Sequence, residues 1–358
     1  MRIQSIEKLR KEERSGESGF TMIEMTVAMV VFAIVLGSIY GLLEVGRSAR
    51  FNTMESNEAS QDVRIGLNRI GIDVLNAGVD YPSSGSVMRT NWLTTNLSVA
   101  TGAANLTPVI PGFQINTLIN TRTGTTARTD QITLTSTDNA FNRVGGVSTP
   151  LRVVSANPAI GWLTCQNAND ANSCNLGDLM CVNSGNCGFC GNGVLALVTG
   201  RATNVRSNDT VVAAASDPMG INDWTPAPPS NLVQVLTPTP AGAYRISMVT
   251  YYVLDDGSGQ GTGTFMRRTW GGVDSSGNVV RFTDQPLAFD VTAMTIQYFM
   301  QDGTSTANPA LSNFHNVRQI SVTITVRSPR TDPKTGLNYI DTLTAVFNTR
   351  NLGFETNG

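Results

Sequence analysis

The sequence contains little of what enzymes and nucleic-acid-binding proteins need. Its 358 residues include one histidine, His315, which disfavours Ser-His-Asp and Cys-His catalysis and most zinc sites, because these use imidazole. Charged residues make up only 15% of the chain, and 25 Lys and Arg stand against 27 Asp and Glu. Without an excess of positive charge, binding of nucleic acid through its phosphates is also disfavoured. The composition therefore predicts neither an enzyme nor a nucleic-acid-binding protein, and it indicates no cofactor.

The abundant residues indicate β structure. The chain contains 34 glycines, and Thr, Ser and Asn are frequent from about residue 80 onward. Such a composition is typical of an antiparallel β protein with many turns. It also suits a domain that is exposed outside the cytoplasm.

The first 43 residues indicate a membrane anchor. Residues 1–19 contain five Lys and Arg and no apolar run, whereas residues 20–43 form an apolar stretch of 24 residues whose only charge is Glu24. As an α-helix this stretch is about 36 Å long, enough to cross a hydrocarbon core of about 30 Å. Because the positive charges precede it, we expect the N-terminus to stay in the cytoplasm and the remainder to be translocated.

The small residues at which a leader could be removed lie before the apolar stretch. A secretory signal is cut behind its apolar region, but Leu43–Arg47 is a poor cleavage site. Cleavage between Gly19 and Phe20 would instead remove residues 1–19 and leave the apolar helix at the new N-terminus. The alternative is an uncleaved signal anchor with an incidental glycine.

Glu24 favours the first interpretation. A carboxylate costs about 2.5–3.5 kcal/mol at the centre of a membrane on insertion scales, and such residues are functional by default. A simple anchor would have no use for it. After cleavage the α-amino group of Phe20 would lie four residues away on the same helix face. Glu24 could then neutralise this amine or the amine of a neighbouring copy.

The residues Gly19-Phe20-Thr21-Met22-Ile23-Glu24, followed by the apolar run, resemble the prepilin cleavage and methylation signature. This signature belongs to type IV pilins and to the pseudopilins of type II secretion. The resemblance implies cleavage after Gly19 by a prepilin peptidase, N-methylation of Phe20, and subunit docking through Glu24. Many major pilins have a proline within this helix, whereas this chain has none between Phe20 and Pro82.

Residues 44–77 continue the helix as an amphipathic segment. Apolar residues recur there with helical spacing and form one stripe, which consists of Val63, Leu67, Ile70 and Val74. We expect the sheet of the same chain to cover this stripe. Gly78 and the pair Tyr81-Pro82 are expected to end the helix.

Residues 78–358 are expected to form a β-rich head, so the predicted fold class is α+β. Alternating apolar residues predict strands at Ile246–Tyr252, Ile320–Val326 and Leu343–Phe347. A short apolar run, Val194–Val198, predicts a buried strand. Residues 83–130 and 200–240 have weak periodicity and many Thr, Asn and Pro. We expect both stretches to be long insertions or loops.

A second, more diffuse resemblance covers residues 244–352. The segments that carry it are Tyr244-Arg245, the run Val249–Leu254, Met266-Arg267-Arg268, Val291–Tyr298, Val317-Arg318-Gln319-Ile320 and the tail Thr349-Arg350-Asn351-Leu352. These segments are similar to the C-terminal half of PilW-type minor pilins. The J subunit of the type II secretion pseudopilus is similar in size and layout. Removing a 19-residue leader would leave 339 of the 358 residues, which is large for the repeating subunit of a filament.

All five cysteines lie within residues 165–190, in a stretch rich in Asn and Gly, with the spacing C-x8-C-x6-C-x5-C-x2-C; they are Cys165, Cys174, Cys181, Cys187 and Cys190. In a translocated domain the default expectation is that disulfides stabilise a long loop. The connectivity cannot be assigned, and one cysteine is left over. A metal site of four thiolates is the alternative, but the irregular spacing and an oxidising compartment disfavour it.

Two further features have alternative explanations. Asp255 and Asp256 lie in a glycine-rich segment and could bind calcium, although a hairpin turn uses the same residues. Tryptophans occur near loop-rich segments and could form an adhesive surface, but core packing explains them equally well; they are Trp92, Trp162, Trp224 and Trp270.

Together these observations predict a minor type IV pilin that primes or caps pilus assembly, with adhesion, twitching motility or DNA uptake as downstream roles. Its expected partners are the prepilin peptidase, other pilins, the membrane and the inner-membrane assembly platform. Its expected location is the bacterial inner membrane, with a periplasmic head, and then the cell surface. The alternatives are a J-like pseudopilin of type II secretion and a pilus-tip adhesin that binds through its loops and cysteine-rich segment.

Overall fold

A computed structural model describes most of the chain, namely residues 19–79, 81, 86–87, 92–99, 105–138, 140–141, 143–144, 147–166, 174–184, 193–202, 210–224, 232–236, 241–331 and 336–352. Two compact units are present. The first contains residues 1–54 and 332–337, and the second contains residues 55–331 and 338–358. The long helix α2 (Met22–Asn76) contributes to both units.

In the first unit, α2 is an exposed apolar helix. Met22–Arg47 is long and apolar enough to cross a membrane, and none of this window is buried against other parts of the chain. Because exposed apolar surface of this extent is unfavourable in water, the segment fits a single-pass membrane anchor.

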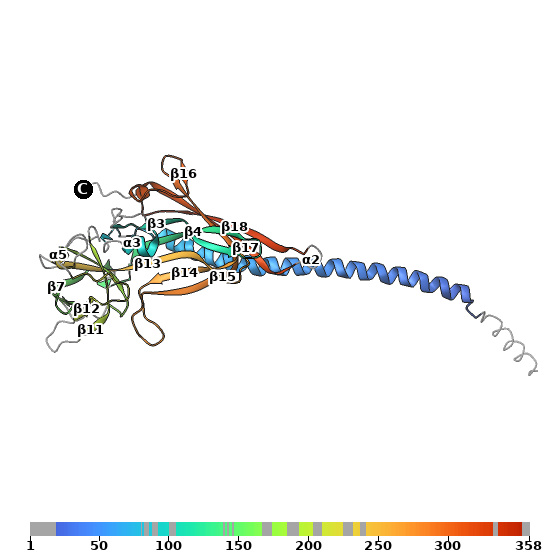
Figure 1. The fold of residues 1–358 in the computed structure, drawn as a ribbon, viewed down its shortest axis with the longest axis horizontal. Coiled ribbons are helices and arrows are strands. Elements are labelled where there is room, and N and C mark those ends of the chain that lie inside the picture. Colours follow the sequence, from blue (N-terminus) through green and yellow to red (C-terminus); the bar gives the residue numbers. More distant parts are fainter. Residues whose placement is uncertain are drawn as a thin grey trace, which may run out of the picture. The chain divides into compact units, whose positions relative to one another are not determined.

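In the second unit, 16 strands of the described residues form one sheet (Figure 1). The main path runs through nine strands, in the order β11 (Gly200–Ala202), β12 (Thr210–Val212), β8 (Trp162–Cys165), β7 (Leu151–Asn157), β13 (Ala241–Asp255), β14 (Gly263–Trp270), β15 (Phe282–Met300), β17 (Val317–Thr331) and β18 (Asn338–Asn348). The other seven strands pair beside this path: β1 (Ser86–Val87), β2 (Asn105–Leu106), β3 (Val109–Asn120), β4 (Thr125–Thr137), β9 (Leu179–Ser184), β10 (Val194–Leu197) and β16 (Ser305–Thr306).

Smaller elements complete the described part of the second unit. They are the two-stranded sheet β5 (Arg143–Val144) and β6 (Val147–Ser148), the helices α3 (Trp92–Leu97) and α5 (Leu232–Val235), and the 3-10 helix η1 (Leu311–Asn316).

Strand β13 is the centre of the sheet. Its first half pairs with β7 and β9, and its second half pairs with β4 and β14. These ladders are antiparallel, and β1 with β10 is the one parallel pair among the described strands. Residues 248–253 of β13 are buried on both faces of the sheet, because the strand has neighbours on both sides and cores above and below. The predicted alternation at Ile246–Tyr252 describes only one of these faces.

The C-terminal part of α2 packs on the sheet, as the sequence predicts. The stripe of Val63, Leu67, Ile70 and Val74 is buried in a core that also contains residues of β4, β13, β15 and β17 (Figure 1). Gly71 permits the helix to approach β18 closely. A Cβ atom at this position would lie 2.5 Å from the ring of Phe347, which is too close for two carbon atoms.

The helix ends where the sequence predicts. Its last residue is Asn76, and Gly78 follows with φ of 79°, a left-handed conformation that favours glycine. The Gly78 N–H donates to the carbonyl of Thr135 at 3.0 Å, so the turn also connects the helix to β4.

Two more cores lie on opposite faces of β9. Met180 and Val182 belong to one of them, and Leu179 and Cys181 belong to the other. Strands β7, β11 and β12 lie together at the end of the second unit that is farthest from the start of α2's packed segment in Figure 1, and β8 pairs with β7 and β12. The predicted strand Val194–Val198 is confirmed as β10, Val194–Leu197, and all four of its residues are buried.

The expectation of loops at residues 83–130 is wrong for much of that stretch. Val109–Asn120 and Thr125–Thr137 form the long paired strands β3 and β4. Threonines occupy buried positions of β4, and Thr133 Oγ1 lies 2.7 Å from Thr250 Oγ1 on β13. Because a polar residue type fills these buried sites, the sequence shows no apolar period. In residues 200–240, the described parts contain β11, β12 and α5 together with turns and irregular backbone at residues 213–224, which agrees with the loop expectation there; residues 203–209, 225–231 and 237–240 lie outside the described residues.

Candidate functional site

The start of α2 places Glu24 at the helix N-terminus. Thr21 precedes the first helical residue, and its N–H and hydroxyl both donate to Glu24 Oε2 at 2.9 Å. The Glu24 N–H in turn donates to Thr21 Oγ1 at 3.3 Å. This reciprocal pair is a capping box, in which a Thr and a Glu three residues later satisfy unpaired donors of the first turn. The carboxylate therefore has a local structural role that the sequence argument missed, although the T-x-x-E spacing signals it.

Glu24 also lies within an apolar face of the helix. One shallow groove is lined by residues at helical spacing, namely Phe20, Ile23, Glu24, Val27, Ala28, Val31, Phe32 and Val35. Phe20 and Glu24 thus share a face, as the four-residue spacing predicts. Gly19 is exposed, and the space around its Cβ position is open to 4 Å. The peptide bond between Gly19 and Phe20 is accessible at this end of the described chain.

This segment matches a known family. Residues 14–40 match the family described as the prokaryotic N-terminal methylation motif. The chain has a type IV pilin-like N-terminus. No curated protein matches the chain. The match covers residues 14–40 and does not extend to the head, so it gives the class of the N-terminal segment alone.

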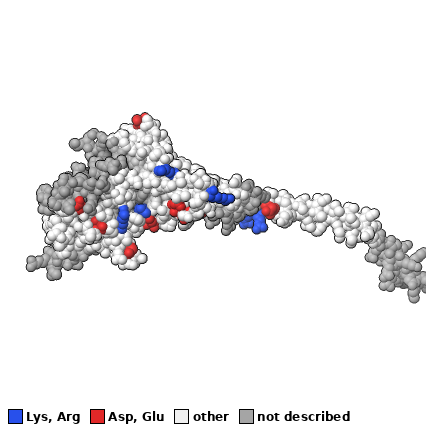
Figure 2. Space-filling model, in the orientation of Figure 1, with Lys and Arg blue, Asp and Glu red and all other residues white. Residues whose placement is uncertain are grey.

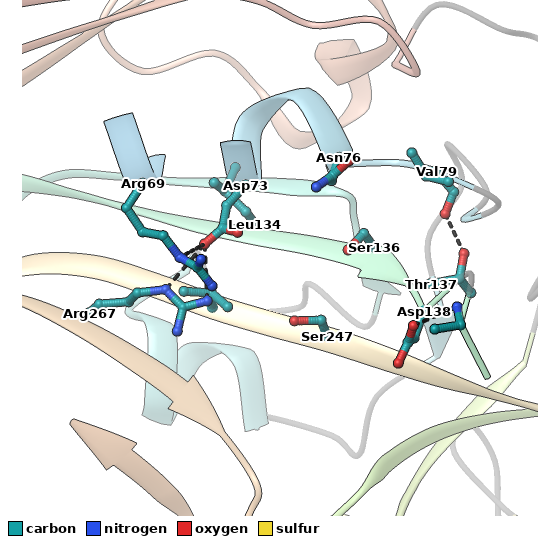
Figure 3. Close-up of a pocket in the computed structure, with 12 residues that line it drawn as sticks. Arg69, Asp73, Asn76, Val79, Leu134, Ser136, Thr137, Asp138, Ser247 and Arg267 are labelled. Atoms are coloured by element: carbon teal, nitrogen blue, oxygen red, sulfur yellow. Dashed lines mark hydrogen bonds and ion pairs between the residues drawn. The ribbon is translucent and has the colours of Figure 1, made fainter. Parts of the chain in front are cut away.

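In the second unit, a partly buried polar contact joins α2 to the sheet. Asp73 Oδ2 accepts a hydrogen bond from the Tyr251 hydroxyl at 2.6 Å and from Arg267 Nη2 at 3.1 Å. Arg69 approaches the same oxygen at 4.0 Å. Figure 3 shows both guanidinium groups converging on Asp73 from the helix and from β14.

This contact forms one wall of a cleft with a volume of about 470 Å³. The residues that line it are Arg69, Asp73, Asn76, Val79, Leu134, Ser136, Thr137, Asp138, Ala140, Ser247, Val249 and Arg267. The set includes neither histidine nor cysteine, and its charged groups are paired. Burial raises the pKa of the Tyr251 phenol, and the neighbouring Asp73 adds to this rise, so the phenol stays protonated and donates. We interpret the cleft as a structural joint between helix and sheet.

Two further arginines connect strands in the same way. Arg245 Nη2 donates to Asp138 at 2.6 Å, and its Nη1 donates to Asp178 at 3.2 Å. Arg268 pairs with Asp284 at 2.7 Å, and its guanidinium lies 3.6 Å from the ring centroid of Phe282. Arg245 and Arg268 lie in the segments that resemble PilW-type minor pilins. Their ion pairs give both arginines a role in stabilising the fold.

The predicted cysteine-rich loop is partly regular structure. Cys165 ends β8 and Cys181 lies within β9, and both are fully buried along with Cys174. Cys181 takes part in a disulfide, which removes it from any thiolate metal site. Cys165 and Cys174 belong to a different core from Cys181. Cys187 and Cys190 lie outside the described residues, so the described part of the chain assigns no connectivity to the cluster.

The carboxylates of Asp255 and Asp256 serve the β13–β14 hairpin. Asp255 accepts from the N–H groups of Ile119 at 2.7 Å and Gly257 at 2.7 Å. Asp256 accepts from the Ser258 N–H at 2.8 Å and the Thr262 hydroxyl at 2.6 Å. These bonds match the turn interpretation, in which Asp side chains bind backbone donors two residues on.

Three of the tryptophans are core residues. Trp92, Trp224 and Trp270 are at most 9% exposed, and each indole N–H donates to an oxygen within the head. Trp162 is half-buried. Their packing accounts for them, and an adhesive surface built on these residues is not supported.

Proposed function

We propose that this protein is a minor type IV pilin, a structural subunit that primes or caps the assembly of a pilus. The matched methylation motif and the exposed apolar helix behind it support the class. The proteins that carry this motif are in general structural rather than enzymatic. The size of the head and its resemblance to PilW-type minor pilins favour a minor subunit over the repeating one.

In this proposal a prepilin peptidase cleaves between Gly19 and Phe20 and removes residues 1–19, and Phe20 is N-methylated. The helix of residues 20–43 then holds the subunit in the inner membrane until the assembly platform extracts it. The amphipathic residues 44–77 carry the head, residues 78–358, outside the cytoplasm. Because the helix face around Phe20 is apolar and exposed, neighbouring pilins can bury it in the filament.

Glu24 is proposed to dock the subunit. Its carboxylate lies on the same face as Phe20, in a surface that is otherwise apolar. Pairing with the N-terminal amine of a neighbouring subunit would neutralise both charges in a medium where unpaired charge is costly. This pairing would set the axial position of the subunit.

The capping box makes this role testable by separating charge from helix capping. Glu24→Gln keeps a capping side chain but removes the charge, whereas Thr21→Ala breaks the box and leaves the charge. We expect Glu24→Gln and Glu24→Ala to be processed normally and to be lost from purified pili, and Thr21→Ala to be incorporated. Gly19→Ala is expected to block processing, measured by the mobility of the protein on gels. Normal incorporation of Glu24→Gln would refute the docking role.

The pilus role is tested by deleting the gene and scoring surface pili by electron microscopy beside the secreted proteins. Loss of pili with normal secretion supports a priming minor pilin. Loss of secretion with normal pili would identify a J-like pseudopilin instead. Survival of both, with loss of attachment alone, would identify a pilus-tip adhesin.

A further inference from the structure

Two adjoining hollows lie in the second unit, around residues 300–316 and the start of β3. The first has a volume of about 480 Å³ and is lined by Met300, Gln301, Asp302, Thr304, Thr306, Asn308, Pro309, Ala310, Asn313 and Asn316. The second has a volume of about 540 Å³ and is lined by Ser98, Val99, Pro111, Gly112, Phe113, Ile115, Asn308, Pro309 and Ala310. Residues 308–310 line both hollows and so form the ridge between them. We call the pair the two-part groove.

The first hollow is polar and almost uncharged. Six of its ten lining residues are Asn, Gln or Thr, and Asp302 is the one charged residue among them. One oxygen of Asp302 already accepts from the N–H and hydroxyl of Thr304, at 2.9 and 2.6 Å. The amides of Asn308 and Asn316 each offer two donors and an acceptor within one planar group. Such groups bind neighbouring hydroxyls, which need a donor and an acceptor close together.

The second hollow is apolar. Apart from Ser98 and Asn308, its lining residues are Val, Pro, Gly, Phe, Ile and Ala, with no charged residue. Phe113 is 43% exposed there, which leaves part of an aromatic ring open to solvent. An exposed aromatic side chain beside planar amides is suited to a ligand whose own ring has an apolar face and carries hydroxyl groups.

The fold holds Phe113 in place. The residue lies in a bulge of β3, between Gly112 and Asn116, and the next residue, Gln114, has φ of 52°. The buried carboxylate of Asp130 fixes this bulge, because it accepts from the Gln114 N–H at 2.8 Å and from the Ile296 N–H of β15 at 2.8 Å. A non-glycine residue in this conformation is strained, so the bulge persists only because its surroundings determine it.

The polar hollow is fixed in a similar way. The Gln301 N–H donates to the carbonyl of Asn316 at 2.7 Å, which ties the β15–β16 turn to η1. Arg318 supports both elements, because it donates to the carbonyl of His315 at 2.7 Å and to the side-chain oxygen of Gln301. A site that is ordered before the ligand arrives loses less entropy on binding.

We propose that the two-part groove binds a neutral carbohydrate, with one sugar face against Phe113 and its hydroxyls on the amides of Asn308 and Asn316. No Lys or Arg lines either hollow, and the guanidinium of Arg318 beside Gln301 already donates to Gln301 and to the carbonyl of His315, so the lining residues offer an acidic glycan or a phosphate no cation. Figure 2 likewise shows few and scattered charges on the face in view, without a patch of one sign. The site lies outside the cysteine-rich segment 165–190. It is independent of the pilin role, which rests on the N-terminal helix.

The test uses the full chain in nanodiscs of phosphatidylcholine, prepared without glycoside detergents, because their head groups would compete. The labelled protein is applied to an array of neutral, sialylated and sulfated oligosaccharides. A neutral oligosaccharide found there is then titrated against Phe113→Ala, Asn308→Asp and the matched control Phe289→Ala. Phe289 is also an exposed phenylalanine but lines neither hollow.

We expect binding of one or a few neutral oligosaccharides, a loss of about tenfold or more in affinity for Phe113→Ala and for Asn308→Asp, and no change for Phe289→Ala. Phe113 and Asn308 are exposed, and thermal unfolding of each variant checks that the head is intact. Three results would overturn the proposal: no glycan bound, binding of acidic glycans alone, or neutral binding that both groove variants retain. Binding to a glycoprotein that persists after its glycans are removed would point to a peptide ligand and would also overturn it.

Discussion

The contact between Asp73 and Arg267 gives the sharpest test of how α2 is held on the sheet. Asp73 is on the helix and Arg267 on β14, and their side chains are only 16% and 12% exposed. Replacing Asp73 by Ala removes the carboxylate and leaves the Arg267 guanidinium in the cleft with the hydroxyls of Tyr251 and Thr269 as partners. The variant therefore measures the cost of an uncompensated charge.

The expected loss follows from two contributions. Breaking a buried ion pair from one side costs about 3–5 kcal/mol, because a charge is left without its partner. The cleft admits water, and Arg267 keeps two hydroxyl partners, so the lower part of this range applies. The hydrogen bond from Tyr251 to the carboxylate is lost as well, but the water that enters the cleft pairs with the phenol and offsets most of its contribution of about 1.5–3 kcal/mol. We expect Asp73→Ala to lower the free energy of unfolding by about 3–4 kcal/mol.

The assay is urea unfolding of the full chain in nanodiscs, followed by tryptophan fluorescence. Trp270 lies on β14 with Arg267, so its signal reports this part of the sheet. Asp62→Ala is the matched control, because Asp62 is on the exposed side of the same helix and should change stability by less than about 0.5 kcal/mol. The double variant Asp73→Ala/Arg267→Met removes the unpaired charge and should recover at least about 1 kcal/mol relative to Asp73→Ala.

Two results would refute this reasoning. A loss below about 0.5 kcal/mol for Asp73→Ala would mean that the contact is too hydrated to matter. Additive losses in the double variant would mean that the two side chains act independently, since coupled residues deviate from additivity by about 0.5–3 kcal/mol.

Two further predictions concern the same unit. Gly71→Ala should destabilise it by about 1 kcal/mol, because the strain against the Phe347 ring exceeds the helix-propensity gain of about 0.5–1 kcal/mol; urea unfolding measures this, and an increase in stability would contradict it. Burial raises the pKa of Tyr252 to about 12, whereas the pKa in the unfolded chain is about 10. The protonated phenol therefore stabilises the folded state fully below pH 10, and this stabilisation is lost as the pH rises toward 12. Melting temperatures between pH 9 and 12 should fall less steeply for Tyr252→Phe than for the unchanged chain, and equal slopes would contradict the assignment.

Local patterns predict the N-terminal helix of this protein well. The apolar run, the amphipathic stripe from Val63 to Val74 and the end of the helix near Gly78 all agree with the structure, because helix formation and amphipathicity depend on residues three and four apart. The strand at Ile320–Val326 is also confirmed, since its apolar residues alternate and are buried. The T-x-x-E capping box is equally local, because it joins Thr21 to a residue three positions later.

Sequence patterns do not predict strands whose buried residues are polar, or contacts between residues that are far apart in the chain. Threonines and Asp130 occupy buried positions of β4, so the strand has no apolar period that could be recognised. Asp73 looked like one of several charges on the polar face of a helix, because its partner Arg267 is 194 residues away. The two-part groove is assembled from residues 98–99, 111–115 and 300–316, and no local pattern connects them.

Short-range spacing and the cost of exposing apolar residues to water are enough to predict the pilin-like N-terminal segment, the position of its helix and the α+β composition. Long-range contacts in the tertiary structure establish which polar groups are buried together, that Cys165 and Cys181 occupy strands, and that Phe113 and Asn316 line two hollows that share residues 308–310. These features depend on the register of strands that are far apart in the chain. Long-range pairing sets that register, and the order of residues along one segment does not encode it.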